Sequence, residues 1–254
     1  MLRDNVAPHR RALACSQLSG YYAHITAIDQ CVERVAAAID EAGLRDDTIL
    51  VFSGDHGDML ESQWQRSDQQ RGARKQAPYD ESVCVPFLLR YPARFGGDGR
   101  VITEPITTPD IMPTLLQLAG IDSPESVEGM DLSGVLEGGG ATGRDGVLIA
   151  SDHPFADWRT ARGGRSYRGV RTATHTFVRD RNGPWLLFDN EADPFQLDNL
   201  VNRTDLARVQ RRLDHELTGI LAQQGDAFES AEQLRARWGY TVGDDEAIPT
   251  HSVV

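Results

Sequence analysis

The chain has 254 residues and a formal net charge of −12. Hydrophobic residues make up 40% and charged residues 25%, which is typical of a globular protein and excludes a disordered one. Because a nucleic-acid-binding protein needs a basic face to neutralise phosphates, the acidic balance argues against a nucleic-acid partner. An anionic substrate remains compatible with it, since a metal ion and a lysine can reverse the field locally.

Three features of the sequence indicate in which cellular compartment the protein works. The three cysteines, Cys15, Cys31 and Cys84, are too few and odd in number for a disulfide framework. There is no run of 18 apolar residues, so we expect no membrane span. The first residues lack the apolar core of a signal peptide, which slightly favours the cytoplasm. The sequence predicts no oligomeric state.

The first 60 residues predict a helix followed by a strand. Residues 1–19 are polar and basic, and we expect a loop there. Over residues 21–39 apolar side chains recur at steps of three and four, which predicts an amphipathic helix with one buried stripe, ended by Gly43. The apolar run 48–53 indicates a strand buried on both faces. We therefore expect an α/β fold with a mostly parallel sheet flanked by helices.

The middle of the chain predicts a loop, a second strand and a helix. Residues 61–78 are polar with no clear period, and we expect a long active-site loop there. Residues 83–91 predict a second strand, which Pro86 confines to a sheet edge or makes irregular. Residues 107–120 predict a helix with a threonine cap and a glycine stop.

The C-terminal part has a different pattern, which predicts short antiparallel strands and one helix. Asn182-Gly183 is a strong hairpin signal, and an amphipathic helix over 205–223 is expected to pack on a small antiparallel sheet. Strands of that sheet are expected at 147–151, 169–179 and 185–189. The whole chain then divides into an α/β part over 1–136, a glycine-rich linker over 137–146, an α+β subdomain over 147–238 and an acidic tail over 239–254.

Asp55 and His56 are the strongest candidates for binding a metal ion. They follow the predicted strand 48–53 directly, at the sheet edge where α/β proteins bind ligands. Neighbours in a regular strand point to opposite faces, but the flanking Gly54 and Gly57 allow a turn that brings both together. A carboxylate and an imidazole are competent ligands for a divalent metal. The alternative is a capping aspartate beside a hydrogen-bonded histidine. We interpret Asp58, the third polar residue of the cluster, as a turn residue or as one that supports the ligands without binding the metal.

Lys75 is the candidate for holding an anionic substrate. It lies 75 − 55 = 20 residues after Asp55, in the predicted loop between two strands whose ends are expected to adjoin. A compact ammonium there would stabilise charge on a sulfuryl or phosphoryl oxygen. The alternative is a solvated surface charge.

A set of runs in one order resembles the sulfatase family of the alkaline-phosphatase superfamily. The resemblance covers roughly residues 20–200. It is carried by YYAHITAID at 21–29, FSGDHGDML at 52–60, Lys75, PYDES at 78–82, Val85-Pro86, DIMPTLL at 110–116, RGVRT at 168–172 and LFDNEADP at 187–194.

The resemblance implies a fold and a set of roles. The fold would be part of an alkaline-phosphatase-like sandwich. Asp55 and His56 would bind the metal, Lys75 would be catalytic by contacting the sulfate group, and the substrate would be a small-molecule or carbohydrate sulfate ester. The metal would be Ca²⁺, with Mg²⁺, Mn²⁺ or Zn²⁺ as alternatives. The nucleophile would be a formylglycine made from the first residue of a Cys/Ser-x-Pro-x-Arg motif.

This sequence contains no Cys/Ser-x-Pro-x-Arg motif. In Cys84-Val-Pro-Phe-Leu88 the final residue is Leu88, not arginine, and we expect Cys84 to lie inside a strand. Asp46-Asp47 resembles the family's other metal-binding pair but precedes the strand that ends near Asp55, roughly 26 Å away if extended, so we interpret it as a turn. The family's nucleophile and first aspartate pair lie in an N-terminal half that we expect to be missing here.

Other polar residues are weaker candidates. His9 and His24 match the family's substrate-contacting histidine poorly, and we expect His24 to pack or hydrogen-bond in its helix. Asp152 and His153 face a substrate pocket or, the favoured reading, form a turn. We interpret His175 as structural. Basic residues of the loop form a solvated face by default, or attract an anion; they are Arg66, Arg71 and Arg74.

Three functions are compatible with these residues. The first is a metal-dependent sulfate ester hydrolase, present here as a fragment that is inactive alone. The second keeps the fold and hydrolyses phosphonate monoesters or phosphodiesters. The third is a noncatalytic remnant or partner subunit, because removing a nucleophile leaves at best residual catalysis.

Overall fold

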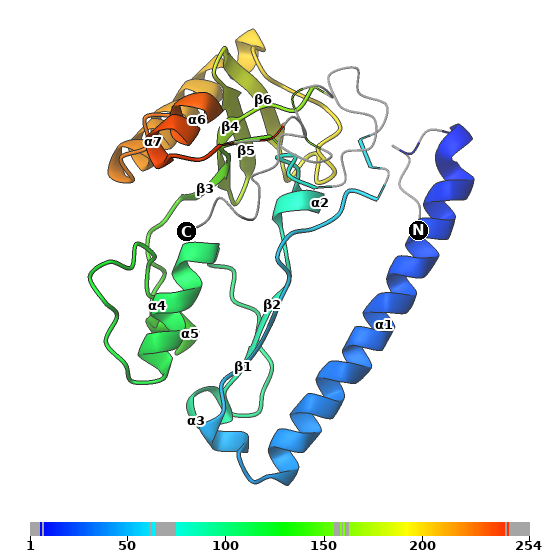
Figure 1. Ribbon diagram of the computed structural model, residues 1–254, viewed down its shortest axis with the longest axis vertical. Coiled ribbons are helices and arrows are strands. Elements are labelled where there is room, and N and C mark those ends of the chain that lie inside the picture. Colours follow the sequence, from blue (N-terminus) through cyan, green and yellow to red (C-terminus); the bar gives the residue numbers. More distant parts are fainter. Residues whose placement is uncertain are drawn as a thin grey trace. The chain divides into compact units, whose positions relative to one another are not determined.

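The computed structural model describes residues 6, 8–60, 62–63, 75–154, 158, 160, 163–241 and 243. The chain divides into two compact units. Figure 1 shows the elements of both, with colours that follow the sequence from blue at the N-terminus to red at the C-terminus. Unit 1 comprises Met1–Leu18, Asp55–Val85 and Leu148–Val254, and unit 2 comprises Ser19–Gly54 and Pro86–Val147. Most of the predicted loop 61–78 and nearly all of the acidic tail lie outside the described residues.

The predicted N-terminal helix is α1, Arg11–Glu41, preceded by the 3₁₀ turn η1, Pro8–Arg10. The expectation of a loop over 1–19 is therefore wrong from Pro8 onward, because the good helix formers between Arg11 and Leu18 extend the helix backwards. The predicted stop is confirmed. Gly43 has φ +70°, and the bonds from its N–H to Asp40 and from Leu44 to Ile39 close the helix end.

The apolar stripe of α1 was predicted to be buried, but it is exposed. Tyr22, Ile25, Ile28 and Val35 are 47–55% exposed in this structure. Spacing at three and four residues identifies a helix with one apolar face, but it says nothing about which element covers that face. Among the described helices, none combines the length and apolar character that a membrane span requires.

Unit 2 contains the two predicted strands of the α/β part. They are β1, Leu50–Ser53, and β2, Phe87–Arg90, which pair antiparallel with Leu50 opposite Arg90 and Ser53 opposite Phe87. The expected mostly parallel sheet is not confirmed, and no residue of β1 is fully buried. A continuous apolar run indicates burial and cannot set strand direction. The predicted turn at Asp46-Asp47 is confirmed as the 3₁₀ turn η2, Arg45–Asp47.

The predicted helix after β2 is α4, Thr108–Leu118, which follows the short helix α3, Pro92–Phe95. Thr107 and Asp110 form a capping box, so the threonine cap is confirmed. The Asp110 carboxylate is buried and accepts two hydrogen bonds from Arg144, at 2.7 and 3.0 Å. Burial alone would raise the pKa of Asp110, but the bonds from Arg144, Thr107 and Met130 lower it to about 2. The short helix α5, Ser133–Leu136, completes unit 2.

Unit 1 is built on a four-stranded sheet in the order β3-β4-β5-β6. Its strands are β3, Gly146–Ser151, β4, Tyr167–Thr172, β5, His175–Asp180, and β6, Gly183–Asp189. The hairpin at Asn182-Gly183 is confirmed, with β5 and β6 antiparallel. The single strand expected over 169–179 is wrong. It is two antiparallel strands joined at residues 173–174, where the Thr172 hydroxyl donates to the carbonyl of His175 and accepts from its N–H.

Both faces of this sheet are covered by apolar side chains. On one face lies α6, Ala207–Gln223, preceded by η5, Thr204–Leu206, which confirms the predicted helix (Figure 1). The buried residues there are Val170, Phe177, Leu187, Leu213, Leu217 and Leu221. The other cluster includes Tyr79, Trp158, Tyr167, Trp185 and Phe188. Tyr79 immediately precedes the single-turn helix α2, Asp80–Val83, so the segment after Lys75 is anchored on the sheet. The last described helix is α7, Ala231–Trp238.

Candidate functional site

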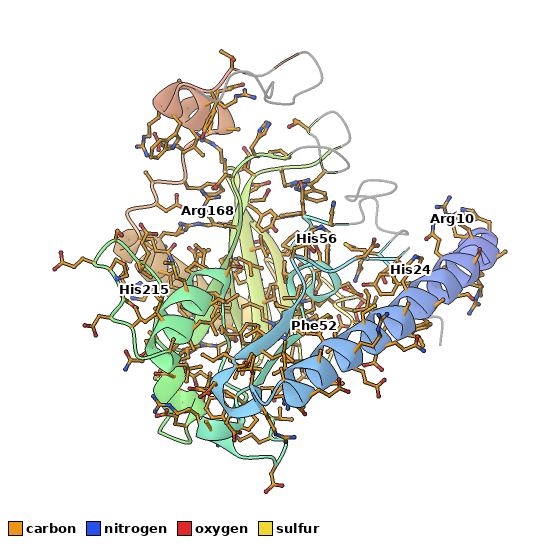
Figure 2. All side chains as sticks on the ribbon, turned by 60° about the horizontal axis from the view of Figure 1, so that its bottom comes forward. Arg10, His24, Phe52, His56, Arg168 and His215 are labelled. Carbon is orange, nitrogen blue, oxygen red and sulfur yellow. The ribbon has the colours of Figure 1, made fainter. Side chains whose placement is uncertain are left out.

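The residues after β1 make the turn that the two glycines predict. Gly57 donates its N–H to the carbonyl of Ser82 at 2.8 Å. A Cβ at this position would lie 1.9 Å from the Glu81 carbonyl oxygen, so only glycine fits against this backbone. Residue 57 is thereby fixed against α2, and the neighbouring His56 is labelled in Figure 2.

Asp55 and His56 converge in this turn. The Asp55 carboxylate accepts a hydrogen bond from the His56 backbone N–H at 2.9 Å, and its second oxygen lies 3.4 Å from His56 Nε2. The first of these interactions lowers the pKa of Asp55, and the charge of Lys75 acts in the same direction. His56 Nδ1 lies 2.9 Å from the Gly57 carbonyl oxygen. Because a carbonyl only accepts, Nδ1 carries the proton there and the lone pair of Nε2 is left for another partner.

Lys75 meets the same imidazole from a distant part of the chain. Its Nζ lies 3.1 Å from His56 Nε2, although the two residues are 19 positions apart. The ammonium therefore donates to the free lone pair of the ring. The structure brings all three candidates, Asp55, His56 and Lys75, to one point of unit 1, and Lys75 is half-buried there.

The donor set at this point fits part of a metal site. Asp55 offers a carboxylate oxygen and His56 offers Nε2. A histidine that binds metal usually donates its other ring N–H to a carbonyl or carboxylate, which is the arrangement of His56 and Gly57. Within the described ranges, no group of three or more His, Cys, Asp or Glu side chains is close enough to hold an ion. Asp55 and His56 are therefore two candidate ligands that lie together, and Asp58 accepts from the N–H of Leu60 as a turn residue.

The segment that carries Lys75 is held by the C-terminal sheet. Tyr167 donates its hydroxyl to the Gln76 carbonyl at 3.0 Å. Asp80 donates its N–H to the Gln196 side chain at 2.8 Å and pairs with Arg171 at 2.9 Å. Gln196 is fully buried and has φ +52°, an uncommon conformation for a residue with a side chain. Sequence reasoning missed Gln196, because an amide side chain in a polar loop follows no hydrophobic period.

A cavity of about 370 Å³ lies next to this segment within unit 1. Its lining includes Asp152 and His153, at which the chain bends after β3, so both residues face a cavity as the other reading expected. Asp152 pairs with Arg168 of β4 at 2.5 Å, and Arg168 is also paired with Asp226.

Cys84 does not lie inside a strand as predicted. It follows α2, three residues before β2 begins. Desolvation, followed by the neighbouring Asp80, raises the pKa of its thiol to about 11. The thiolate is the reactive form, so Cys84 is a poor nucleophile at neutral pH.

Two of the other histidines, His24 and His175, have local partners. His24 Nδ1 lies 2.7 Å from the Gly20 carbonyl within α1, as predicted, and His175 Nδ1 contacts the Thr174 hydroxyl. His9 lies in η1. Three basic residues of the loop lie outside the described residues; they are Arg66, Arg71 and Arg74.

Comparisons with known proteins agree on one family. The model of the family described as Sulfatase matches residues 3–121, and the model described as N-sulphoglucosamine sulphohydrolase, C-terminal, matches residues 73–223. The "Ulvan-active sulfatase" of Formosa agariphila is 37% identical over 253 residues, which are 98% of this chain and 47% of that protein. The chain thus spans about half the length of the curated relatives it matches.

Two solved structures extend the comparison. One, solved in complex with its substrate D-glucosamine-2-N,6-O-disulfate, has a TM-score of 0.67 and 25% identity, covering 80% of this chain and 40% of that one. The phosphonate monoester hydrolase of Agrobacterium radiobacter has a TM-score of 0.66 and 28% identity, covering the same shares. These likenesses confirm an α/β fold of the alkaline-phosphatase type. The chain belongs to the sulfatase family.

Proposed function

We propose that this chain supplies half of a metal-dependent site for the hydrolysis of sulfate esters. The observation that carries the proposal is the meeting of the Asp55 carboxylate, His56 Nε2 and Lys75 Nζ after β1, with distances of 3.4 and 3.1 Å to Nε2. One acidic ligand, one neutral nitrogen ligand and one ammonium match the needs of an anionic ester beside a cation.

Each residue of the site has a distinct role in the proposal. Asp55 and His56 hold a divalent metal, for which Ca²⁺ is expected and Mg²⁺, Mn²⁺ or Zn²⁺ are the alternatives. When bound, the metal polarises the ester oxygens. Gly57 fixes the proton of His56 on Nδ1 and so keeps Nε2 available as a ligand. Lys75 donates to a sulfate oxygen and offsets the charge that develops on it.

The nucleophile in this proposal is a formylglycine outside this chain, because the sequence contains no Cys/Ser-x-Pro-x-Arg motif. We therefore expect no meaningful turnover by the purified chain. Sequencing the DNA upstream of the Met1 codon tests this expectation. An in-frame extension that encodes the motif and an aspartate pair would support it, and robust hydrolysis by the chain alone would contradict it. A true start at Met1 would favour the noncatalytic remnant or partner subunit.

Metal binding is the direct test of the site. Isothermal titration of the chain with Ca²⁺, Mg²⁺, Mn²⁺ and Zn²⁺ should show one site. Asp55→Asn and His56→Gln should each weaken it by at least roughly tenfold. Asp198→Asn, which also removes one exposed carboxylate of unit 1, is the matched control and should bind as the parent does. Equal affinities in all four proteins would refute the assignment of Asp55 and His56.

Hydrolysis of phosphonate monoesters or phosphodiesters is the second candidate. It is favoured by the similarity to the phosphonate monoester hydrolase, whose TM-score and sequence identity to this chain are close to those of the structure solved with the disulfate substrate. The three site residues present the same charges to a sulfuryl and a phosphoryl group. Parallel assays of an extended chain with 4-nitrophenyl sulfate and bis(4-nitrophenyl) phosphate would separate the two functions.

A further inference from the structure

The cavity of about 370 Å³ is formed by β3, β4 and the residue that follows Lys75. Ala150 and Ser151 end β3, Asp152 and His153 follow it, Tyr167 begins β4, and Gln76 closes the remaining side. All six residues belong to unit 1. The volume lies within the range of roughly 300–1,000 Å³ that small-molecule sites occupy.

Gln76 carries two independent signs of a binding residue. Its φ of +70° places it in the left-handed region, which is unfavourable for a residue with a side chain. Its side-chain oxygen Oε1 is buried and accepts no hydrogen bond from the described residues. An unsatisfied buried acceptor is itself unfavourable. Both features are explained if a ligand in the cavity donates a hydrogen bond to Gln76 Oε1.

The charges around the cavity indicate which hydrogen-bond donors of a ligand would bind there. Arg168 is 3% exposed and contacts both Asp152 and Asp226, so this cluster of two carboxylates and one guanidinium has a net charge of −1. The Asp152 side chain is 64% exposed and therefore has room to accept further hydrogen bonds. No lysine or arginine is among the described residues of the lining. The cavity thus offers acceptors and a negative field, which disfavour a carboxylate or a second sulfate.

We propose that this cavity binds the sugar ring of the substrate through its neutral hydroxyl groups, with Gln76 Oε1 and the Asp152 carboxylate as acceptors. The proposal rests on the proposed function and deepens it, because the ring bound there would present its sulfate ester to the adjoining Lys75. It restricts the substrate class to esters whose ring has free hydroxyls and no second anionic group on the side that enters the cavity.

The test uses unsulfated ligands, so that it does not depend on hydrolysis. The ¹⁵N-labelled full chain is titrated with neutral methyl pyranosides that differ in hydroxyl stereochemistry, with methyl glucosaminide and with methyl glucuronide. At least one neutral glycoside should shift the side-chain amide signal of Gln76, and the glucuronide should not. Absence of binding by every neutral glycoside, or binding by the glucosaminide or the glucuronide alone, would overturn the proposal.

Two variants locate the binding. Gln76→Asn retracts the amide oxygen by one methylene, and asparagine tolerates positive φ well, so this variant should fold as the parent does. It should weaken binding of the glycoside roughly tenfold, as should Asp152→Asn, because the first moves a hydrogen-bond acceptor away from the ligand and the second replaces a charged acceptor by a neutral amide. Gln224→Asn, at the exposed end of α6, is the matched control. Unchanged affinity in Gln76→Asn would refute the role of Gln76.

A third variant separates this proposal from the proposed function. A sulfate ester of the bound glycoside should bind more tightly than the glycoside itself, and Lys75→Met should abolish only that gain. If the glycoside binds but its ester gains nothing, the cavity assignment stands and the role of Lys75 fails. If the ester binds through Lys75 but the glycoside does not bind, the cavity assignment fails alone.

Discussion

Gly57→Ala is the sharpest perturbation of the candidate site. The added Cβ would lie 1.9 Å from the Glu81 carbonyl oxygen and 2.9 Å from its carbon, where ordinary contacts begin near 3.4 Å. Because the obstacle is backbone, no side chain can swing away, and residue 57 must separate from α2. The separation breaks the 2.8 Å bond from Gly57 to Ser82, worth about 1 kcal/mol. Strain in the displaced backbone adds roughly 1–3 kcal/mol.

The expected total is about 3 kcal/mol, which lowers the Tm by roughly 10 °C for a protein of this size. Circular dichroism on heating measures this loss. The matched control is Gly219→Ala in α6, where nothing lies within 4 Å of the added Cβ and the helix should gain up to about 1 kcal/mol.

Gly57→Ala should also weaken metal binding, because the Gly57 carbonyl would no longer hold the proton of His56 on Nδ1. A Tm within about 1 °C of the parent, with unchanged metal affinity, would refute the reasoning.

Three further predictions follow from separate contacts. Lys75→Met removes a positive charge 3.1 Å from His56 Nε2, so it should strengthen binding of Ca²⁺ by roughly tenfold while abolishing the gain in affinity that the sulfate group gives to an ester; calorimetry measures both, and weaker Ca²⁺ binding would contradict it. The pKa of Asp110 is lowered to about 2, so its ionised form stabilises the fold above pH 4 by about 2 kcal/mol, and this contribution is lost as the pH falls from 4 through 2. Urea titrations at pH 5 and pH 2 should show that Asp110→Asn reduces the difference in unfolding free energy, and an unchanged difference would count against the pairing with Arg144. Leu217→Ala should cost about 2–5 kcal/mol, measured by urea unfolding, because Leu217 is fully buried between α6 and the sheet; a loss below about 1 kcal/mol would mean that this face is not packed.

Local sequence patterns predicted which helices and strands form, but they did not predict how each element pairs with or packs against others. The three-and-four spacing identified α1, and Asn182-Gly183 identified the β5–β6 hairpin, because both signals are read within a few residues. The direction of β1 and the cover of the α1 stripe depend on other segments. An apolar run is the same in a parallel and an antiparallel strand, and an apolar stripe is the same whether or not a partner is present.

The candidate site was predictable in part for the same reason. Glycines on both sides of Asp55-His56 predicted the turn that brings the two side chains together, and the resemblance to sulfatases pointed to Lys75. Gln76 and Gln196 were not predictable, since their importance lies in a positive φ and in partners up to 133 residues away. The split of 169–179 was missed because Ala173 and Thr174 are not typical turn residues.

The anchoring of the Lys75 segment by Tyr167, Arg171 and Gln196 has a consequence for protein engineering. Replacing Arg171 on β4 or Gln196 in the loop after β6 would change the position of Lys75 without altering a residue of the proposed site or its cavity, whereas replacing Tyr167 would change both the anchor and the cavity wall. Random libraries aimed at new ester specificity should therefore include these three positions. A shortened protein that ends before β4 would lose the anchor altogether, so the C-terminal sheet belongs to the smallest unit in which this half of the site can work.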